Sequence, residues 1–260
     1  MTIKNKILKF YKRTIFTFKK KVNLDIIKID INNLNDLFNH FGSDKGTGII
    51  NPYAKKNEAS TQDVIGHGYG KFYEEHLSFM KNEAIKIMEI GTWKGASVAA
   101  FYFYFNKAKI YCLDRNFKFK FKSKRVKFLN SDTTNINELK KLEQSLIKEK
   151  VDFLDIIIDD GSHIYSDILK NLSFFLKKVK PGGYYVIEDY NHYKFYPELN
   201  DSSNESLEIE DILKFINVKK FFTSNLLDKN FQKYCFDNIS KVIINKGIQK
   251  DSFIVFIKKK

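Results

Sequence analysis

The sequence is poor in several residue types, and each shortage excludes a class of protein. Its two cysteines, Cys112 and Cys235, form neither a disulfide framework nor a metal-binding pair, which indicates a reducing, cytoplasmic setting. It has only three prolines, no low-complexity linker and no internal repeat. No run approaches the ~18 uninterrupted apolar residues that a membrane-spanning helix needs. These shortages leave a globular chain, long enough at 260 residues for one large domain with a short extension.

Arginine is also almost absent, although the net charge is +14. Arginine is the preferred side chain for two-pronged contacts with phosphates and bases, so its scarcity argues against a dedicated nucleic-acid partner. Lysine-rich positive charge would still attract a small anionic molecule, such as a sugar carried on a nucleotide diphosphate.

Residues 4–21 carry apolar side chains at helical spacing with lysines between them, which predicts a basic amphipathic helix. We assign residues 1–31 to a basic N-terminal extension. It would contact the inner face of an anionic membrane, pack on the body of the protein, or contact a second subunit in a homo-oligomer.

The rest of the chain alternates between compact apolar runs and helical patterns. Residues 33–41 and 69–80 are predicted helices, and the glycine-bearing stretch 42–70 between them is predicted to cover a site; together they form a cap, residues 32–82. The predicted helices that follow are 96–105, one around residues 139–146, 168–179 and 207–215. The predicted strands are residues 85–90, 109–113, 126–129, 153–158, 184–187, 242–245 and 252–257.

Strands alternating with helices predict an α/β, Rossmann-like fold. We expect a doubly wound, mostly parallel seven-stranded sheet over residues 83–260, with the last two strands as an antiparallel hairpin at one edge. Polar clusters follow nearly every strand, at the carboxyl ends where such sheets bind ligands.

The first of these clusters predicts a cofactor site. Gly91 and Gly95 join a strand to a helix and allow a ligand to approach the backbone and the helix N-terminus. Glu89 just before them suits the ammonium of a methionine moiety better than a pyrophosphate. Asp114, which ends the next strand, is placed to accept ribose hydroxyls, and Asp132, after the third strand, to reach an adenine amino group.

Any one of these residues alone would be explained by a turn or a helix cap. Four of them in register at strand ends instead make the sequence resemble class I S-adenosylmethionine-dependent methyltransferases. Thr92, Arg115 and Asp159 adjoin the same strand ends and complete the candidate cofactor site.

The fourth and fifth strands end in a second cluster. Asp159-Asp160-Gly-Ser-His163 follows one strand, and Glu188-Asp189 follows the other. Converging carboxylates repel one another unless they are neutralised, so the cluster predicts a hard divalent cation, Mg²⁺ or Mn²⁺, with positions open to a substrate diol. His163 is placed to remove the proton of a metal-bound hydroxyl. Alternatively, Asp160 or Ser162 caps the next helix.

The residues that make up these motifs show a closer resemblance. Phe41-Gly-Ser-Asp44-Lys45-Gly46, His67-Gly-Tyr69 with Tyr73, Asp-Asp-Gly-Ser-His and Ile-Glu-Asp resemble the macrolide-sugar O-methyltransferases and their relatives in bacterial capsular-polysaccharide clusters. The resemblance implies Mg²⁺ and methylation of a sugar hydroxyl. It also implies that His163 is the general base and that Asp160, Glu188 and Asp189 are metal ligands. It places Lys45, His67 and Tyr69 on an element that closes over cofactor and substrate.

One loop departs from the family. Residues 190–196 replace its tryptophan-containing loop, and Tyr190, His192 and Tyr193 would either contact the sugar or close the loop onto the sheet. The shorter N-terminus favours a nucleotide sugar or a surface-glycan residue over a large macrolide. Three alternatives remain: methylation of a catechol-like molecule, methylation of nucleic acid, and a non-catalytic assembly partner on the same scaffold.

Overall fold

A computed structural model describes residues 21–50, 64–116, 121–202 and 205–260. The amphipathic helix predicted for residues 4–21 lies outside this part of the chain, except for Lys21, as does most of the middle of the stretch 42–70. Within the described residues no helix is long and apolar enough to cross a bilayer.

The centre of the molecule is a seven-stranded sheet with the order β10-β11-β9-β8-β4-β5-β7. The five strands from β9 to β7 run parallel, and β10 and β11 form an antiparallel hairpin at the β9 edge. This confirms the predicted fold class and the edge hairpin. The strands are β4 (Lys86–Ile90), β5 (Lys109–Asp114), β7 (Val126–Asn130), β8 (Leu154–Asp159), β9 (Val179–Glu188), β10 (Ile239–Lys246) and β11 (Phe253–Lys259).

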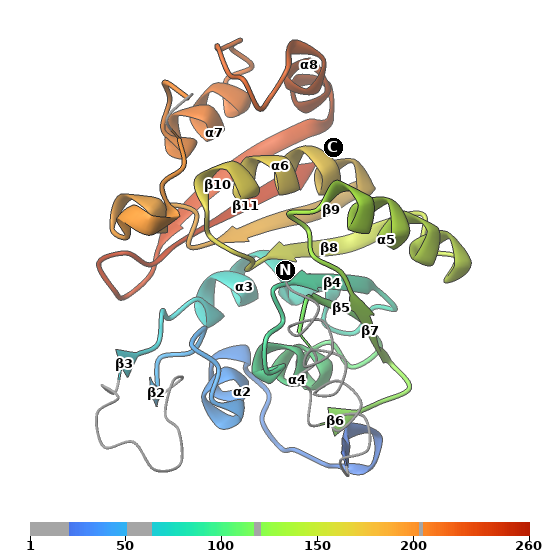
Figure 1. The fold of residues 1–260 in the computed structure, drawn as a ribbon. Helices are drawn as coiled ribbons and strands as arrows, with labels where there is room; N and C mark the ends of the chain where they lie inside the picture. The colour runs from blue at the N-terminus through green and yellow to red at the C-terminus, as the bar shows by residue number, and fades with distance from the viewer. Residues whose placement is uncertain (1–20, 51–63, 117–120, 203–204) are drawn as a thin grey trace, which may run out of the picture.

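Helices cover both faces of this sheet (Figure 1). One layer contains α2 (Leu34–Phe41), α3 (Gly70–Leu77) and α4 (Ala96–Tyr104). The other contains α5 (Ile136–Lys148), α6 (Tyr165–Phe175), α7 (Ile209–Asn217) and α8 (Lys229–Asn238). Because neighbouring residues of a strand point to opposite faces, Ile87 packs in the first layer and Met88 in the second.

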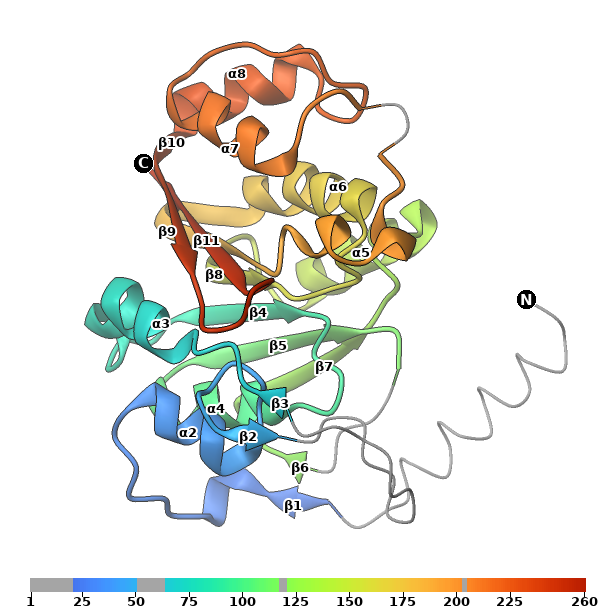
Figure 2. The same cartoon turned by 90° about the vertical axis from the view of Figure 1, so that its left-hand side faces the viewer.

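Short elements complete the fold. Two-residue strands pair as β1 (Val22–Asn23) with β6 (Phe121–Lys122) and as β2 (Ile49–Ile50) with β3 (Val64–Ile65), all on the side of α2 and α4 (Figure 2). The 3₁₀ turns are η1 (Leu24–Ile26), η2 (Ser78–Met80), η3 (Leu176–Lys178), η4 (His192–Lys194) and η5 (Pro197–Leu199).

Local sequence accounts for several boundaries. The Asn33 side chain accepts a hydrogen bond from the Asp36 N–H and begins α2, and Gly42 ends it in the left-handed conformation at φ +68°. The region after α6 corrects a prediction. The helix expected to continue to Val179 ends at Phe175, because Val179 already pairs with Leu154 as the start of β9, and the Pro-Gly-Gly segment is a register shift inside that strand.

A candidate methyltransferase active site

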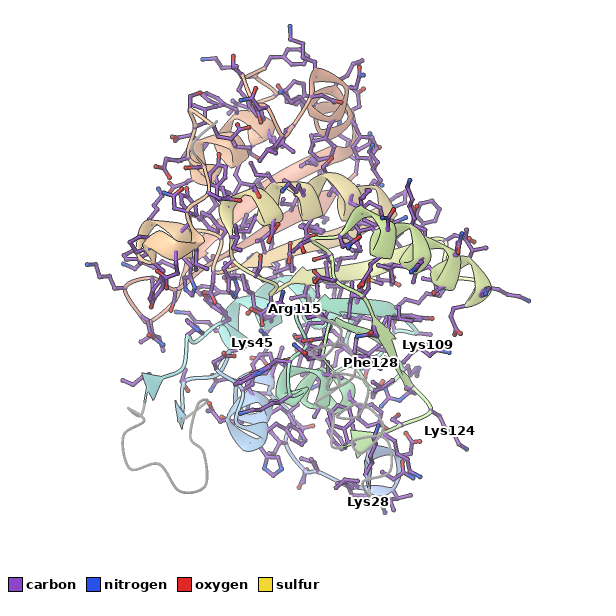
Figure 3. The ribbon with its side chains drawn as sticks, in the orientation of Figure 1. Lys28, Lys45, Lys109, Arg115, Lys124 and Phe128 are labelled. Atoms are coloured by element: carbon purple, nitrogen blue, oxygen red, sulfur yellow. The ribbon has the colours of Figure 1, made fainter. Side chains whose placement is uncertain are left out.

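The parallel strands bring the predicted polar residues to one edge of the sheet. A cavity of about 400 Å³ lies there, and its lining includes Gly91, Asp114, Arg115, Asp132 and Asp160, with His163 at the same edge. A second cavity of about 630 Å³ also borders the glycine loop, and its lining includes Lys45, Thr92 and Gly95. Lys45 and Arg115 are labelled in Figure 3. The two cavities share four lining residues, Asp44, Gly91, Trp93 and Asp160.

The loop between β4 and α4 can accept only glycine at Gly91. Its φ is +84°, and a Cβ there would lie 1.8 Å from the carbonyl oxygen of Asp160. Gly95 also has φ +84° and precedes α4 with no side-chain cap. The α4 N-terminus therefore has N–H groups that no capping side chain satisfies, next to the larger cavity.

Asp114 and Asp132 both line the smaller cavity, and both also organise their own loops. Asp114 accepts hydrogen bonds from the Trp93 N–H at 2.7 Å and the Asn116 N–H at 2.6 Å. Asp132 Oδ1 accepts from the Thr134 N–H and hydroxyl, and its Oδ2 lies 3.9 Å from Arg115 Nη1. Asp114 and Asp132 therefore each hold their own loop in place and also face the cavity.

Two predicted cofactor residues lie behind the cavity walls. Glu89 is fully buried and lines neither cavity, so the direct contact predicted for it is not preformed. Neither of its carboxylate oxygens has a hydrogen bond of normal geometry among the described residues, although the Ser97 and Thr92 side chains lie close enough to lower its pKa. Burial raises the pKa of Glu89 to about 7, against the opposing effect of Lys45. When ionised, the Glu89 carboxylate would attract a cationic ligand bound above the loop electrostatically, without touching it.

Asp159 points away from the edge, which corrects its prediction as a cofactor contact. As the residue before Asp160 it faces the opposite side of the sheet, toward α6. There its oxygens accept hydrogen bonds from the Tyr185 hydroxyl at 2.9 Å and the Asn171 amide at 3.2 Å. Burial raises the pKa of Asp159 to about 6. Its role in this structure is to anchor α6 to the sheet.

Asp160, Glu188 and Asp189 come together as predicted. Each offers one carboxylate oxygen, and these three atoms all lie within 4.8 Å of one another. Three hard oxygen donors suit Mg²⁺ or Mn²⁺. An ion bound by three protein ligands would keep further coordination positions for water and a substrate. The donor set therefore fits the divalent ion expected from the sequence.

The segment before the sheet supplies the groups that hold these carboxylates. Lys45 is 1% exposed, and its Nζ lies 2.5 Å from Asp160 Oδ2 and 2.6 Å from Glu188 Oε2. The Tyr69 hydroxyl donates to Asp189, and the Tyr73 hydroxyl to Glu188. Lys45 and Tyr69, expected on a covering element, are thus buried against the predicted metal ligands. The Tyr69–Tyr73 spacing of four residues places both on one helical face, a signal in the sequence for this pairing.

Charge in this cluster is balanced largely by Lys45. Burial lowers the pKa of the Lys45 ammonium, but Asp160 and Glu188 more than offset this and raise it well above the ordinary lysine value. Burial likewise raises the pKa of Asp160, but Lys45 and His163 hold it below its usual value. For Glu188, burial raises the pKa more than Lys45 lowers it.

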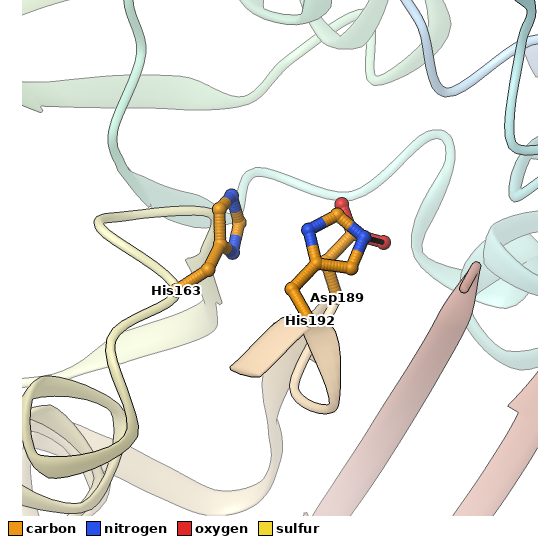
Figure 4. A group of neighbouring side chains, drawn as sticks. All are labelled: His163, Asp189 and His192. Carbon is orange, nitrogen blue, oxygen red and sulfur yellow. Dashed lines mark ion pairs between the residues drawn. The ribbon is translucent and has the colours of Figure 1, made fainter. Parts of the chain in front are cut away.

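Two histidines stand beside the carboxylates (Figure 4). His163 Nε2 lies 3.5 Å from Asp160 Oδ1, and His192 Nε2 lies 3.4 Å from Asp189 Oδ1. Their ring centroids are 5.2 Å apart. His163 and Asp189 both have positive φ, +57° and +54°, a strained conformation that is common at functional sites. His67 Nε2 lies 3.8 Å from Asp189 Oδ2.

The loop after β9 has the packing of one of the two predicted alternatives. Tyr190 and Tyr193 are buried in the core between the sheet and α6–α8, so they close the loop onto the sheet. Their rings pack on Phe253 and Tyr165. His192, between them in the chain, is the residue of this group that faces the candidate site.

The fold and this edge define a class of protein. A parallel sheet with a glycine loop after its first strand, and acidic residues after the next strands, is the Rossmann-like fold of S-adenosylmethionine-dependent methyltransferases. The methyltransferase domain family matches residues 88–190, which contain most of the site.

Particular relatives sharpen this class. The chain is 29% identical over 130 residues to mycinamicin VI 2''-O-methyltransferase of Micromonospora griseorubida, covering 47% of this chain and 31% of that protein. It is 30% identical over 130 residues to demethylmacrocin O-methyltransferase of Streptomyces fradiae, covering 47% and 32%. The chain thus spans about a third of the curated relatives it matches.

Solved structures support the fold. The MycE methyltransferase from the mycinamycin biosynthetic pathway, in complex with Mg and SAH, superposes with a TM-score of 0.62 at 22% identity. The match covers 87% of this chain and 54% of that one. At this identity the likeness concerns the fold, which extends well beyond the region of sequence similarity.

Proposed function

We propose that this protein is an S-adenosylmethionine-dependent O-methyltransferase that acts on a sugar hydroxyl. The observation that carries the proposal is the convergence of three carboxylate oxygens within 4.8 Å, next to His163. Of these groups, Asp160 and His163 line the cavity that also contains Gly91, Asp114 and Asp132. When bound, the cofactor supplies the methyl group, and a divalent cation supplies a Lewis acid that acidifies the acceptor hydroxyl.

The glycine loop and the strand ends would bind the cofactor. Gly91 lets it approach the backbone, and Asp114 and Asp132 accept hydrogen bonds from its hydroxyl and amino groups. Arg115 and Thr92 border the same cavities. Glu89 favours a cationic ligand from below the loop.

His163 would remove the proton of the acceptor hydroxyl through Nε2. Asp160, 3.5 Å away, stabilises the imidazolium that forms. Asp160, Glu188 and Asp189 would hold the divalent cation, and Lys45, Tyr69 and Tyr73 fix those carboxylates. Transfer then depends on the alignment of oxygen, methyl and sulfur, which the rigid strand ends provide.

We infer the acceptor class from the relatives, because some of them, such as L-olivosyl-oleandolide 3-O-methyltransferase of Streptomyces antibioticus, are named for a substrate that carries a sugar. We propose a sugar linked to a nucleotide, or a residue of a surface polysaccharide, for this chain. Its net charge of +14 favours an anionic carrier.

Methyl transfer to a panel of nucleotide sugars, other glycosides and catechols tests this proposal. We expect product with sugars, loss of turnover in EDTA and recovery with Mg²⁺ or Mn²⁺. His163→Ala should lower kcat by roughly 10²- to 10⁴-fold, the usual contribution of a general base, with cofactor affinity retained in calorimetry.

Full activity in excess EDTA would remove the cation from the mechanism. Turnover of catechols but not of sugars would mean that the methyl acceptor is a phenol. Absence of cofactor binding would leave a scaffold without this activity.

A further inference from the structure

His163, His192 and Asp189 form a second group of potential ligands beside the three carboxylates. One ligand atom from each lies within 4.8 Å of the other two (Figure 4). This group shares Asp189 with the carboxylate set but differs from it in chemistry, because two of its three donors are imidazole nitrogens. Imidazole nitrogen suits Zn²⁺, Co²⁺ and Ni²⁺, whereas Mg²⁺ prefers oxygen donors.

One of the three separations between ligand atoms is that of a metal site of this kind. Two ligand atoms about 2.1 Å from one ion at a tetrahedral angle lie about 3.4 Å apart, from the usual zinc bond lengths. His192 Nε2 and Asp189 Oδ1 are separated by 3.4 Å. Asp189 Oδ1 accepts one hydrogen bond, from Tyr69, and a carboxylate oxygen has a second lone pair for another partner.

His192 Nε2 is the atom of this group that is buried without a hydrogen bond among the described residues. It is buried and has no hydrogen-bond partner within the described part of the chain, even though Asp189 and Asp251 lie 3.4 and 3.8 Å away. A buried nitrogen without a partner is costly unless something binds it. The side chains of His163 and His192 are 22% and 13% exposed, which leaves a path for an ion to enter.

We propose that His163, His192 and Asp189 bind a transition-metal ion of the Zn²⁺ class at a site separate in ligand type from the three-carboxylate site. The part of this proposal that concerns catalysis rests on the function proposed above. An ion bound to the His163 imidazole removes the proposed general base from the reaction, so Zn²⁺ inhibits methyl transfer even at saturating Mg²⁺.

Cobalt provides a probe that does not depend on activity. Titration of the full-length protein with Co²⁺ should give visible absorption bands typical of nitrogen ligation, and Zn²⁺ should displace them. His192→Ala and His163→Ala should each weaken binding by at least about 10- to 100-fold, the loss that follows removal of even an outer-shell partner. Calorimetry with Zn²⁺ alone gives the same comparison.

Two variants serve as controls. His40→Ala removes a histidine from the last turn of α2, away from this cluster, and should leave the cobalt spectrum unchanged. Glu188→Gln changes the carboxylate site only, so it should weaken Mg²⁺ binding and keep the cobalt bands.

The outcomes separate this proposal from the proposed function. Cobalt bands that depend on both histidines, in a protein without methyl transfer, support the metal site and reject the function. Normal methyl transfer without nitrogen-type bands, or with bands unchanged in His192→Ala, overturns the metal site alone.

Discussion

Two glutamates on strands separated by β8 are buried almost equally but surrounded differently. Glu188 at the end of β9 is 1% exposed, and Glu89 in β4 is fully buried; both point toward the layer of α2, α3 and α4. Glu188 accepts hydrogen bonds from Lys45 and Tyr73. Neither oxygen of Glu89 has a hydrogen bond of normal geometry among the described residues.

The difference separates the two halves of the site. The carboxylates of the proposed metal side are held in place by the chain itself, through a cation that is already built in. The carboxylate beneath the cofactor loop has no hydrogen-bonded cation in the described part of the chain, and Lys45 offsets its burial only in part, so that its pKa is still raised to about 7. Neutralising substitutions on the two sides should therefore change stability in opposite directions.

Removal of the built-in cation should have the largest effect. Lys45→Met leaves Asp160 and Glu188 buried without their shared partner, which should lower the free energy of unfolding of the metal-free protein by about 3–5 kcal/mol. Added Mg²⁺ should restore more stability to the variant than to the wild type, because the ion replaces the missing charge. Chemical denaturation with and without Mg²⁺ measures both.

A surface pair provides the matched control. Lys127 Nζ lies 2.6 Å from Glu149 Oε1, a separation like that of Lys45 from Glu188, but Lys127 is 46% exposed. Lys127→Met should change stability far less, because water screens this pair. Equal losses in the two variants, or an Mg²⁺ effect no larger in Lys45→Met than in wild type, would contradict the built-in role of Lys45.

The sequence predicts where the carboxylates of the site lie, but not the group that neutralises them. Compact apolar runs and the polar residues that follow them locate five strand ends, which predicts Asp114, Asp132, Asp160 and Glu188 at one edge of the sheet. The partner of Asp160 was not predicted as such. Lys45 precedes it by 115 positions, and no local pattern indicates that a loop lysine becomes buried between two carboxylates.

Other differences also reflect tertiary packing. Asp159 and Asp160 are adjacent and chemically alike in the sequence, and only the alternation of β8 turns one toward α6 and the other toward the cavity. Helix α8 was not predicted, although Asp228 caps it and Phe231 and Cys235 are four residues apart on its buried face. That signal was present in the sequence.

A smaller effect should appear in the pH dependence of stability. The pKa of Glu89 is raised from 4.5 to about 7 in the folded protein, so folding favours the protonated form. This contribution is fully present below pH 4.5 and is lost as the pH rises through about 7. Between pH 5 and 7 the wild type should lose about 2 kcal/mol relative to Glu89→Gln, which has no proton to release. Denaturation of both proteins at several pH values, without cofactor, gives this difference.

Glu198→Gln, which changes an exposed glutamate, is the control for that comparison. A difference between wild type and Glu89→Gln that does not vary with pH would mean that Glu89 is compensated in the free protein.

The smallest expected effect concerns cofactor affinity, and it has the opposite sign. Glu89→Gln should weaken binding of S-adenosylmethionine about tenfold at pH 8, because a charge several ångströms away in a protein contributes on the order of 1–2 kcal/mol. Wild-type affinity should fall as the pH drops below about 7, where Glu89 takes up a proton, and the affinity of the variant should stay nearly constant. Calorimetry on both proteins from pH 6 to 8 measures this. Equal cofactor affinities of wild type and Glu89→Gln at every pH would mean that the charge of Glu89 does not contribute to cofactor binding. Glu89 and Glu188 would then differ only in their effect on stability.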